Sequence, residues 1–207
     1  MTYDPDPART ALLIIDAQRE YFDADGALFT EHAAEILDNL LALLEAARRS
    51  GTRVVFVRHI QAADGSDTGR MADFDETPSF VAGTPGVEII PRLVPREDEP
   101  VVDKTRYSAF VNTRLESILK TWGVDTVLIS GLMTQYCSVT TARHAHDLDY
   151  RVIFVADANA GPDLPDLGFG AVPHADALRV IATSLAGGIA DVTDTGGVVA
   201  RLNGASA

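Results

Sequence analysis

The sequence has little of several residue types, and each shortage excludes a class of protein. Cys137 is the only cysteine among 207 residues, so no disulfide can form within the chain and a redox cysteine would lack a resolving partner. Lys and Arg number 17 against 30 Asp and Glu, a formal net charge of −13 at pH 7. This excess of acidic residues disfavours nucleic acid and anionic membrane surfaces as partners, because their phosphates would be repelled.

Long apolar runs and targeting signals are also missing. Residues 1–10 are polar and rich in proline, and the first apolar run, 11–15, is too short for a signal peptide or a membrane span. With a single cysteine, this predicts a cytoplasmic protein with no membrane association. Neither a G-x-G-x-x-G motif nor a phosphate loop occurs, so no dinucleotide cofactor is expected. The length and the 46% hydrophobic content predict one globular domain over residues 1–207.

Short apolar segments alternate with segments of helical periodicity along the chain. Strands that are apolar at consecutive positions are typical of a parallel sheet buried on both faces. The alternation predicts an α/β fold, a three-layer α-β-α arrangement around a six-stranded, mainly parallel, doubly wound sheet. The predicted strands are 11–15, 54–57, 100–103, 127–129, 151–156 and 189–192, and the predicted helices are 31–50, 110 or 111 to 122, 138–146, 173–186 and 195–202.

Residues 60–100 interrupt this alternation. The segment is rich in Asp, Gly and Pro and has only weak periodicity. A connection of this length is often an active-site lid or an interface arm. We therefore expect it to contribute to a substrate pocket.

Three reactive residues follow three different predicted strands. Asp16 follows the first strand, Lys104 the third and Cys137 the fourth. The carboxyl ends of parallel strands meet at one edge, and ligands bind where the strand order reverses. Each residue alone has a more ordinary interpretation: a capping Asp, a surface Lys or a buried Cys. Together they predict a nucleophilic Cys137 with Asp16 as acid and base and Lys104 as electrostatic support.

Cys137 is predicted to lie where a strand passes into a helix. Free N–H groups at a helix start carry partial positive charge. We expect them to lower the pKa of the Cys137 thiol and to hold an oxyanion during acyl transfer.

Three motifs carry a family resemblance: Ile15-Asp16-Ala17-Gln18 with Phe22, Asp103-Lys104 with Tyr107-Ser108-Ala109-Phe110, and Gly131-Leu132-Met133-Thr134-Gln135-Tyr136-Cys137 with Thr141-Ala142-Arg143. In this order they resemble the isochorismatase-like cysteine hydrolases, from about residue 10 to residue 202. The resemblance implies an Asp16–Lys104–Cys137 triad and a cis peptide at Leu132-Met133, which would direct the Met133 N–H, beside that of Cys137, into an oxyanion hole. It also implies cleavage of C–N bonds in small amides, ureas and carbamoyl compounds by a homodimer or homotetramer.

Two departures of this sequence from the motifs of the family narrow the range of possible activities. Nicotinamidases carry a metal-binding Asp-x-His after the second strand, whereas this chain has His59-Ile60-Gln61. We therefore predict no catalytic metal and no other cofactor, with His59 in the pocket wall. Isochorismatases proper hydrolyse a vinyl ether and lack the nucleophilic cysteine, so Cys137 favours amide hydrolysis.

The residues flanking the triad are candidates for binding a small-molecule substrate, although the aromatic ones are about as typical of a core or an interface. We expect Arg106 to bind a substrate carboxylate. The candidate substrate-binding residues are Gln18, Phe22, Arg106, Tyr107, Phe110 and Tyr136.

Three functions are compatible with the sequence. The first is a cysteine hydrolase of a small amide, ureido or lactam-type substrate. The second is a non-covalent vinyl ether hydrolase with Asp16 as the acid, and the third is a binding protein without activity on the same scaffold. The full triad favours the first function, but the sequence does not identify the substrate.

Overall fold

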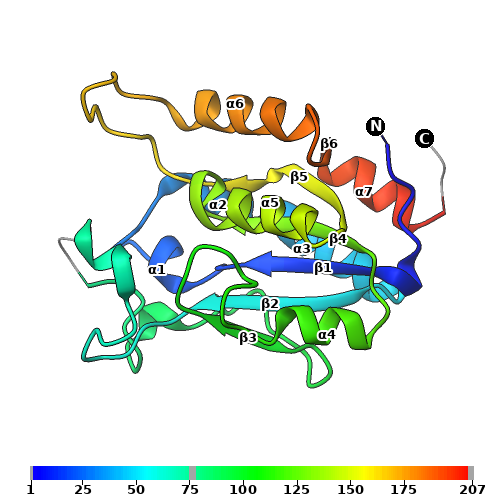
Figure 1. The fold of residues 1–207 in the computed structure, drawn as a ribbon, viewed down its shortest axis with the longest axis horizontal. Helices are drawn as coiled ribbons and strands as arrows, with labels where there is room; N and C mark the ends of the chain where they lie inside the picture. The colour runs from blue at the N-terminus through cyan, green and yellow to red at the C-terminus, as the bar shows by residue number, and fades with distance from the viewer. Residues whose placement is uncertain (1, 75–77, 205–207) are drawn as a thin grey trace.

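The computed structural model describes residues 2–74 and 78–204 and contains one six-stranded sheet (Figure 1). The strand order is β3-β2-β1-β4-β5-β6, and every neighbouring pair is parallel. The chain therefore winds outward from β1 to β3 and then crosses back to place β4 on the other side of β1. This confirms the predicted doubly wound sheet and places the switch point between β1 and β4. The strands are β1 Thr10–Ile15, β2 Arg53–His59, β3 Val101–Lys104, β4 Thr126–Leu132, β5 Arg151–Ala160 and β6 Asp191–Thr193.

Helices cover both faces of the sheet. On one face α3 and α7 pack against alternate residues of β1 such as Leu12, and on the other α4, α5 and α6 pack against the intervening residues such as Leu13 (Figure 1). Because successive side chains of a strand point to opposite faces, β1 has to be apolar throughout. The helices are α1 Arg19–Phe22, α2 Glu31–Glu35, α3 Leu37–Ser50, α4 Leu115–Thr121, α5 Val139–Asp147, α6 His174–Ala186 and α7 Thr195–Leu202, with 3₁₀ turns η1 Pro7–Arg9, η2 Gly69–Asp73 and η3 Pro85–Val87 and a π-helical turn η4 Thr134–Ser138.

Two helix predictions were wrong at their boundaries. The helix predicted over 31–50 is divided at Ile36 into α2 and α3, which the continuous apolar periodicity does not reveal. The helix predicted from 110 or 111 begins only at Leu115. Asn112 has a φ of 56°, a left-handed conformation that a right-handed helix cannot include.

Among the strands that extend beyond their predicted ends, β4 and β5 extend the furthest. β4 continues through Ser130-Gly131 to Leu132, and β5 continues to Ala160. Gly131 has a φ of 121°, and a Cβ there would lie 1.9 Å from the Ile15 carbonyl oxygen. Position 131 therefore requires glycine, because β4 approaches the end of β1 closely there. Strand β4 continues through Gly131 and does not end at it.

The described parts of the segment 60–100, residues 60–74 and 78–100, fold against the carboxyl edge of the sheet. Gln61 pairs with Val81, Gln18 pairs with Ile89, and Phe80 is buried. The segment thus covers the edge at which Asp16, Lys104 and Cys137 lie. Of the helices in the described ranges, none combines the length and apolar character needed to cross a membrane.

Candidate active site

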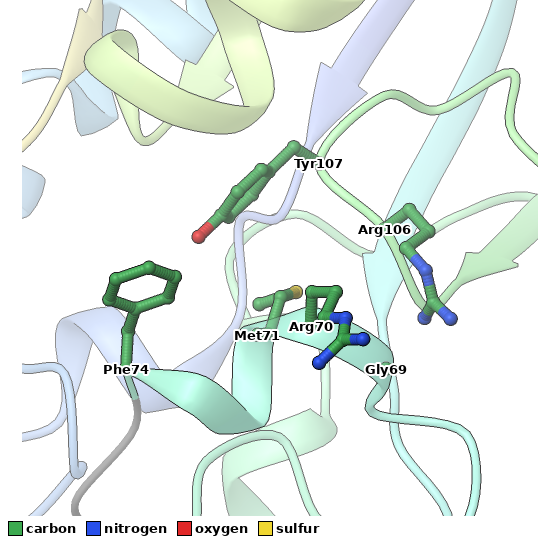
Figure 2. Close-up of a pocket in the computed structure, with 6 residues that line it drawn as sticks. All are labelled: Gly69, Arg70, Met71, Phe74, Arg106 and Tyr107. Atoms are coloured by element: carbon green, nitrogen blue, oxygen red, sulfur yellow. The ribbon is translucent and has the colours of Figure 1, made fainter.

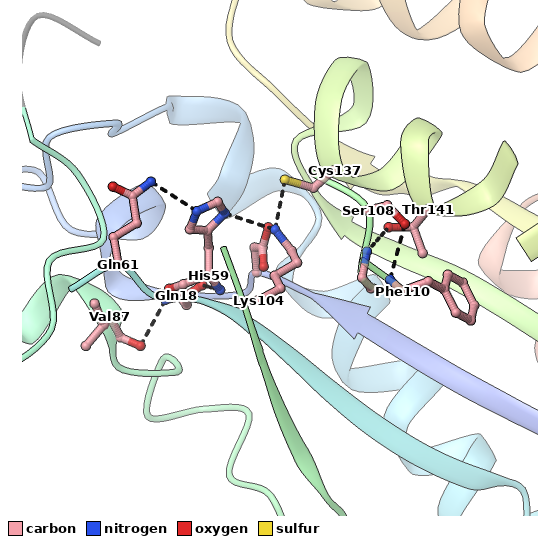
Figure 3. Close-up of polar contacts among 11 residues, drawn as sticks. Gln18, His59, Gln61, Val87, Lys104, Ser108, Phe110, Cys137 and Thr141 are labelled. Atoms are coloured by element: carbon pink, nitrogen blue, oxygen red, sulfur yellow. Dashed lines mark hydrogen bonds and ion pairs between the residues drawn. The ribbon is translucent and has the colours of Figure 1, made fainter. Parts of the chain in front are cut away.

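The structure brings the three predicted reactive side chains together at the β1/β4 switch point. Asp16 follows β1, Lys104 ends β3 and Cys137 lies in η4, directly after β4. The Lys104 Nζ is 2.8 Å from Asp16 Oδ2 and 3.2 Å from Cys137 Sγ (Figure 3). At 0%, 1% and 3% exposure, the three side chains are shielded from water. A carboxylate, an ammonium group and a thiol therefore share one dry site, where electrostatic interactions are strong.

His59, the last residue of β2, completes the surroundings of Lys104. Its Nδ1 lies 3.0 Å from Lys104 Nζ (Figure 3), so the three N–H bonds of the ammonium group meet three acceptors. Burial and the Lys104 charge lower the pKa of His59 to about 2. Because the ammonium group can only donate, the Nδ1 of the neutral ring accepts this hydrogen bond. This contact was not predicted from the sequence, although His59 and Lys104 end neighbouring strands and are paired in register.

The expected lowering of the Cys137 pKa was wrong. Burial and the negative charge of Asp16 raise the pKa of the thiol to about 12, although Lys104 opposes them. The desolvation of a buried thiolate outweighs the stabilisation expected from the helix start. Cys137 is therefore a thiol in the resting site and needs a base before it can attack.

Asp16 and Lys104 form the charged pair of the site. Burial raises the pKa of the Asp16 carboxyl, although the Lys104 charge opposes this shift. Burial alone would lower the pKa of Lys104, but the negative charge of Asp16 and the hydrogen bonds to Asp16 and Cys137 outweigh it and the pKa is raised. The 2.8 Å contact thus joins a carboxylate to an ammonium group.

Asp16, His59 and Cys137 also offer ligand atoms that lie within 4.8 Å of one another, a spacing that would suit a metal ion. However, the Lys104 ammonium group lies 2.8, 3.0 and 3.2 Å from Asp16 Oδ2, His59 Nδ1 and Cys137 Sγ, which accept its hydrogen bonds. Lys104 thus provides the cation of this cluster, and a metal ion in the same place would have to displace it.

The turn that carries Cys137 follows a cis peptide bond between Leu132 and Met133. The Met133 carbonyl accepts hydrogen bonds from the N–H groups of Tyr136 and Ser138, which closes the turn. Among the described residues, the N–H of Met133 is not paired with a backbone acceptor. An oxyanion hole formed by the N–H groups of Met133 and Cys137 remains a prediction.

A cavity of about 260 Å³ opens beside the Cys137 thiol. Two of the predicted pocket residues, Tyr107 and Tyr136, line it and stack with their ring centroids 5.3 Å apart. Met71, Phe74 and Phe80, all from the segment 60–100, were not predicted, since that segment has no periodicity to reveal them. We call this the inner cavity; its lining residues are Tyr21, Leu28, His59, Met71, Phe74, Ser79, Phe80, Tyr107, Met133, Tyr136 and Cys137.

Three other predicted pocket residues do not line the inner cavity. Phe110 is a core residue, 7% exposed, that packs on Tyr150, and Phe22 packs against the opposite core. Gln18 is fully buried, and its amide is bonded to the backbone N–H and C=O of His59 and to the C=O of Val87 (Figure 3). These side chains pack behind the residues of the site and do not line the inner cavity.

Arg106 does not present a free guanidinium group to the inner cavity. Its Nη1 donates to the backbone carbonyls of Asp67, Thr68 and Thr105. The Nη1 of Arg106 thus holds the turn at residues 67–68 beside Arg106, and the binding of a substrate carboxylate by Arg106 stays a prediction.

Replacing Gln18 with alanine should destabilise the protein. The change leaves three buried backbone groups of His59 and Val87 unpaired, which we expect to lower the free energy of unfolding by roughly 2–5 kcal/mol. Urea denaturation followed by circular dichroism measures this. Gln135→Ala is the matched control, because the Gln135 amide is buried without a hydrogen-bond partner among the described residues. Equal losses in the two variants would contradict the role assigned to Gln18.

Known proteins share this fold and the sequence that builds it. The isochorismatase domain family matches residues 10–191. Nicotinamidase 3 of Arabidopsis thaliana is 35% identical over 159 residues, 76% of each chain. A ureidoacrylate amidohydrolase of Serratia proteamaculans is 30% identical over 179 residues, 75% of this chain and 72% of that one. The crystal structure of a cysteine hydrolase from Pseudomonas syringae is 39% identical, with a TM-score of 0.95 over 99% of this chain and 97% of that one.

These similarities extend over most of the chain and include the strands and turns that hold Asp16, Lys104 and Cys137. The fold, the three motifs and the composition of the buried site agree with them. The chain belongs to the isochorismatase-like cysteine hydrolase family.

Proposed function

We propose that this protein hydrolyses the C–N bond of a small amide, ureido, carbamoyl or lactam-type substrate through a thioester on Cys137. The observation that carries the proposal is the buried contact of Lys104 Nζ with both Asp16, at 2.8 Å, and the Cys137 thiol, at 3.2 Å. The amidohydrolase activities named for two of the relatives support the reaction class.

Asp16 is the base that activates the nucleophile. Its carboxylate takes the proton from Cys137 Sγ as the sulfur bonds to the substrate carbonyl carbon, which avoids a free thiolate in a site that raises the thiol pKa to about 12. The electron pair of the C=O bond moves to oxygen, and the N–H groups of Met133 and Cys137 stabilise the resulting oxyanion.

Asp16 then acts as the acid. It returns the proton to the substrate nitrogen, the C–N bond breaks as the oxyanion re-forms the carbonyl, and ammonia or an amine leaves. A water molecule next loses a proton to Asp16 and attacks the thioester. The acid product leaves when the C–S bond breaks, and the sulfur recovers its proton from Asp16.

Lys104 keeps Asp16 ionised and adds positive charge beside the sulfur. His59 holds the ammonium group in place through its neutral Nδ1, which is 3.0 Å from Nζ. We assign the two residues electrostatic and positioning roles respectively, and proton transfer is left to Asp16.

The test is ammonia release from a panel of small primary amides, ureides and lactams, with isochorismate in a parallel assay. We expect turnover of at least one C–N substrate and no consumption of isochorismate. Consumption of isochorismate alone would identify a vinyl ether hydrolase. A complete lack of turnover together with binding of panel members would identify a protein that binds without catalysis.

The pH profile of kcat/KM should fall on its acidic side only, with no second fall or rise between pH 7 and pH 10. Protonation of Asp16 removes the base, so activity falls as the pH drops through the Asp16 pKa, which burial raises above its ordinary value. The thiol is the reactive resting form and its pKa is about 12, so its ionisation should not affect the rate between pH 7 and pH 10. A rate that increases with an apparent pKa between 8 and 9 would instead indicate attack by a pre-formed thiolate.

A further inference from the structure

A second cavity lies beside the inner cavity at the same edge of the sheet. This outer cavity has a volume of about 540 Å³ and is lined by Gly69, Arg70, Met71, Phe74, Arg106 and Tyr107 (Figure 2). Met71, Phe74 and Tyr107 line both cavities, and Figure 2 shows the Tyr107 hydroxyl pointing toward the Phe74 ring, with Met71 close by. The two cavities are therefore adjacent, and these three side chains lie between them.

The inner cavity has no charged wall. Among the described residues that line it, none is Asp, Glu, Lys or Arg, and His59 is neutral because its pKa is lowered to about 2. Lys104 is paired with Asp16 at 2.8 Å. In the part of the chain that the structure describes, the inner cavity thus offers no free cationic side chain to pair with a carboxylate on the substrate.

A carboxylate in this cavity would lose part of its hydration without gaining a cationic partner, which is unfavourable. It would also approach a protein of formal net charge −13, which repels anions at long range. An apolar or aromatic group, in contrast, would bury its surface against Met71, Phe74 and Tyr107.

We propose that the substrate is a carboxamide whose part within the inner cavity is uncharged, with an apolar or aromatic body long enough to reach from Cys137 past Met71 and Phe74 into the outer cavity. This rests on the proposed function and adds a substrate class to it. Amides that carry a carboxylate within the length of the inner cavity are poor substrates.

Three primary amides test the proposal: butyramide, succinamate, which has a carboxylate in place of the terminal methyl group, and 4-phenylbutyramide. We expect kcat/KM for ammonia release to be about 10- to 100-fold higher for 4-phenylbutyramide than for butyramide, since a phenyl ring is buried. Succinamate should be at least about 100-fold poorer than butyramide. Calorimetric dissociation constants for the Cys137→Ala variant should follow the same order, which provides a readout independent of turnover.

Phe74→Ala tests the path between the cavities. Phe74 is 85% exposed, so its truncation should leave the fold intact. It should lower kcat/KM for 4-phenylbutyramide about five- to tenfold and change that for butyramide less than twofold. Phe169→Ala is the matched control, because Phe169 is 98% exposed and lines neither cavity; it should change neither value.

The outcomes separate the two proposals. Ammonia release with succinamate equal to or better than butyramide, or with no gain from the phenyl group, would overturn the substrate class and leave the proposed function standing. The expected order of binding without any ammonia release would support the ligand class and overturn the proposed function.

Discussion

Cys137→Ser should reduce kcat by at least about 10⁴-fold, the scale of loss when a catalytic nucleophile is removed. A serine hydroxyl in the same place is far less acidic and less nucleophilic than a thiol, and Asp16 is too weak a base to activate it. The fold should survive, since the exchange is nearly isosteric at a position that is 3% exposed. Ammonia release with the best substrate of the panel measures the loss, and circular dichroism checks the fold.

Ser138→Ala is the matched control for this substitution. Ser138 is adjacent to Cys137, equally buried, and its hydroxyl has no hydrogen-bond partner among the described residues. We expect its kcat to stay within about threefold of the unchanged protein, since no bond is lost. Activity of Cys137→Ser near the level of this control would exclude the covalent route.

Asp16→Asn should damage both activity and stability. The amide cannot take the thiol proton, so kcat should fall by about 10²- to 10⁴-fold. The Lys104 ammonium group would also remain buried without its counter-charge, which we expect to cost about 3–5 kcal/mol of unfolding free energy. Urea denaturation measures the stability. The activity assays are made without urea, under conditions in which the variant is folded.

Asp103→Asn provides the comparison for this second prediction. Asp103 precedes Lys104 on β3 and pairs with Arg58 at 2.8 Å, but its side chain is 45% exposed. A solvent-exposed ion pair contributes little, so the loss of stability should be under about 1 kcal/mol, with kcat unchanged. If Asp16→Asn were no more harmful than Asp103→Asn, the buried ion pair would have no special role.

The positions of the reactive residues were predictable because they depend on strand order alone. Asp16, Lys104 and Cys137 follow apolar strands whose parallel arrangement forces their carboxyl ends to one edge. The contact of His59 with Lys104 follows from the same rule, since these residues end neighbouring strands. The triad geometry is thus a consequence of topology, which hydrophobic patterning encodes.

The substrate pocket was not predictable in the same way. Phe80 reaches the site on a left-handed backbone, with a φ of 54°, and stacks on the ring of His59. Gln18 and Phe110 are near the triad in sequence. However, the Gln18 side chain is hydrogen-bonded to the backbone of His59, and the Phe110 side chain packs in the hydrophobic core. Irregular segments are fixed by tertiary contacts, so residue type and spacing do not show which side chains face the cavity.

The pKa of the Cys137 thiol also depends on tertiary contacts that the local sequence does not show. The sequence placed Cys137 at a helix start, which favours a thiolate. The surroundings that bury it come from several distant segments of the chain, and their desolvation raises the pKa to about 12. The local motif therefore predicted a pKa shift of the Cys137 thiol in the wrong direction, because burial is a property of the whole fold.

The most direct test of covalent catalysis by Cys137 is the partitioning of the acyl group between water and added hydroxylamine. Two substrates with the same acyl group and different leaving groups must pass through the same thioester, so we predict one hydroxamate-to-acid product ratio for both. A lack of hydroxamate during turnover, or a ratio that changes with the leaving group, would contradict a common intermediate on Cys137.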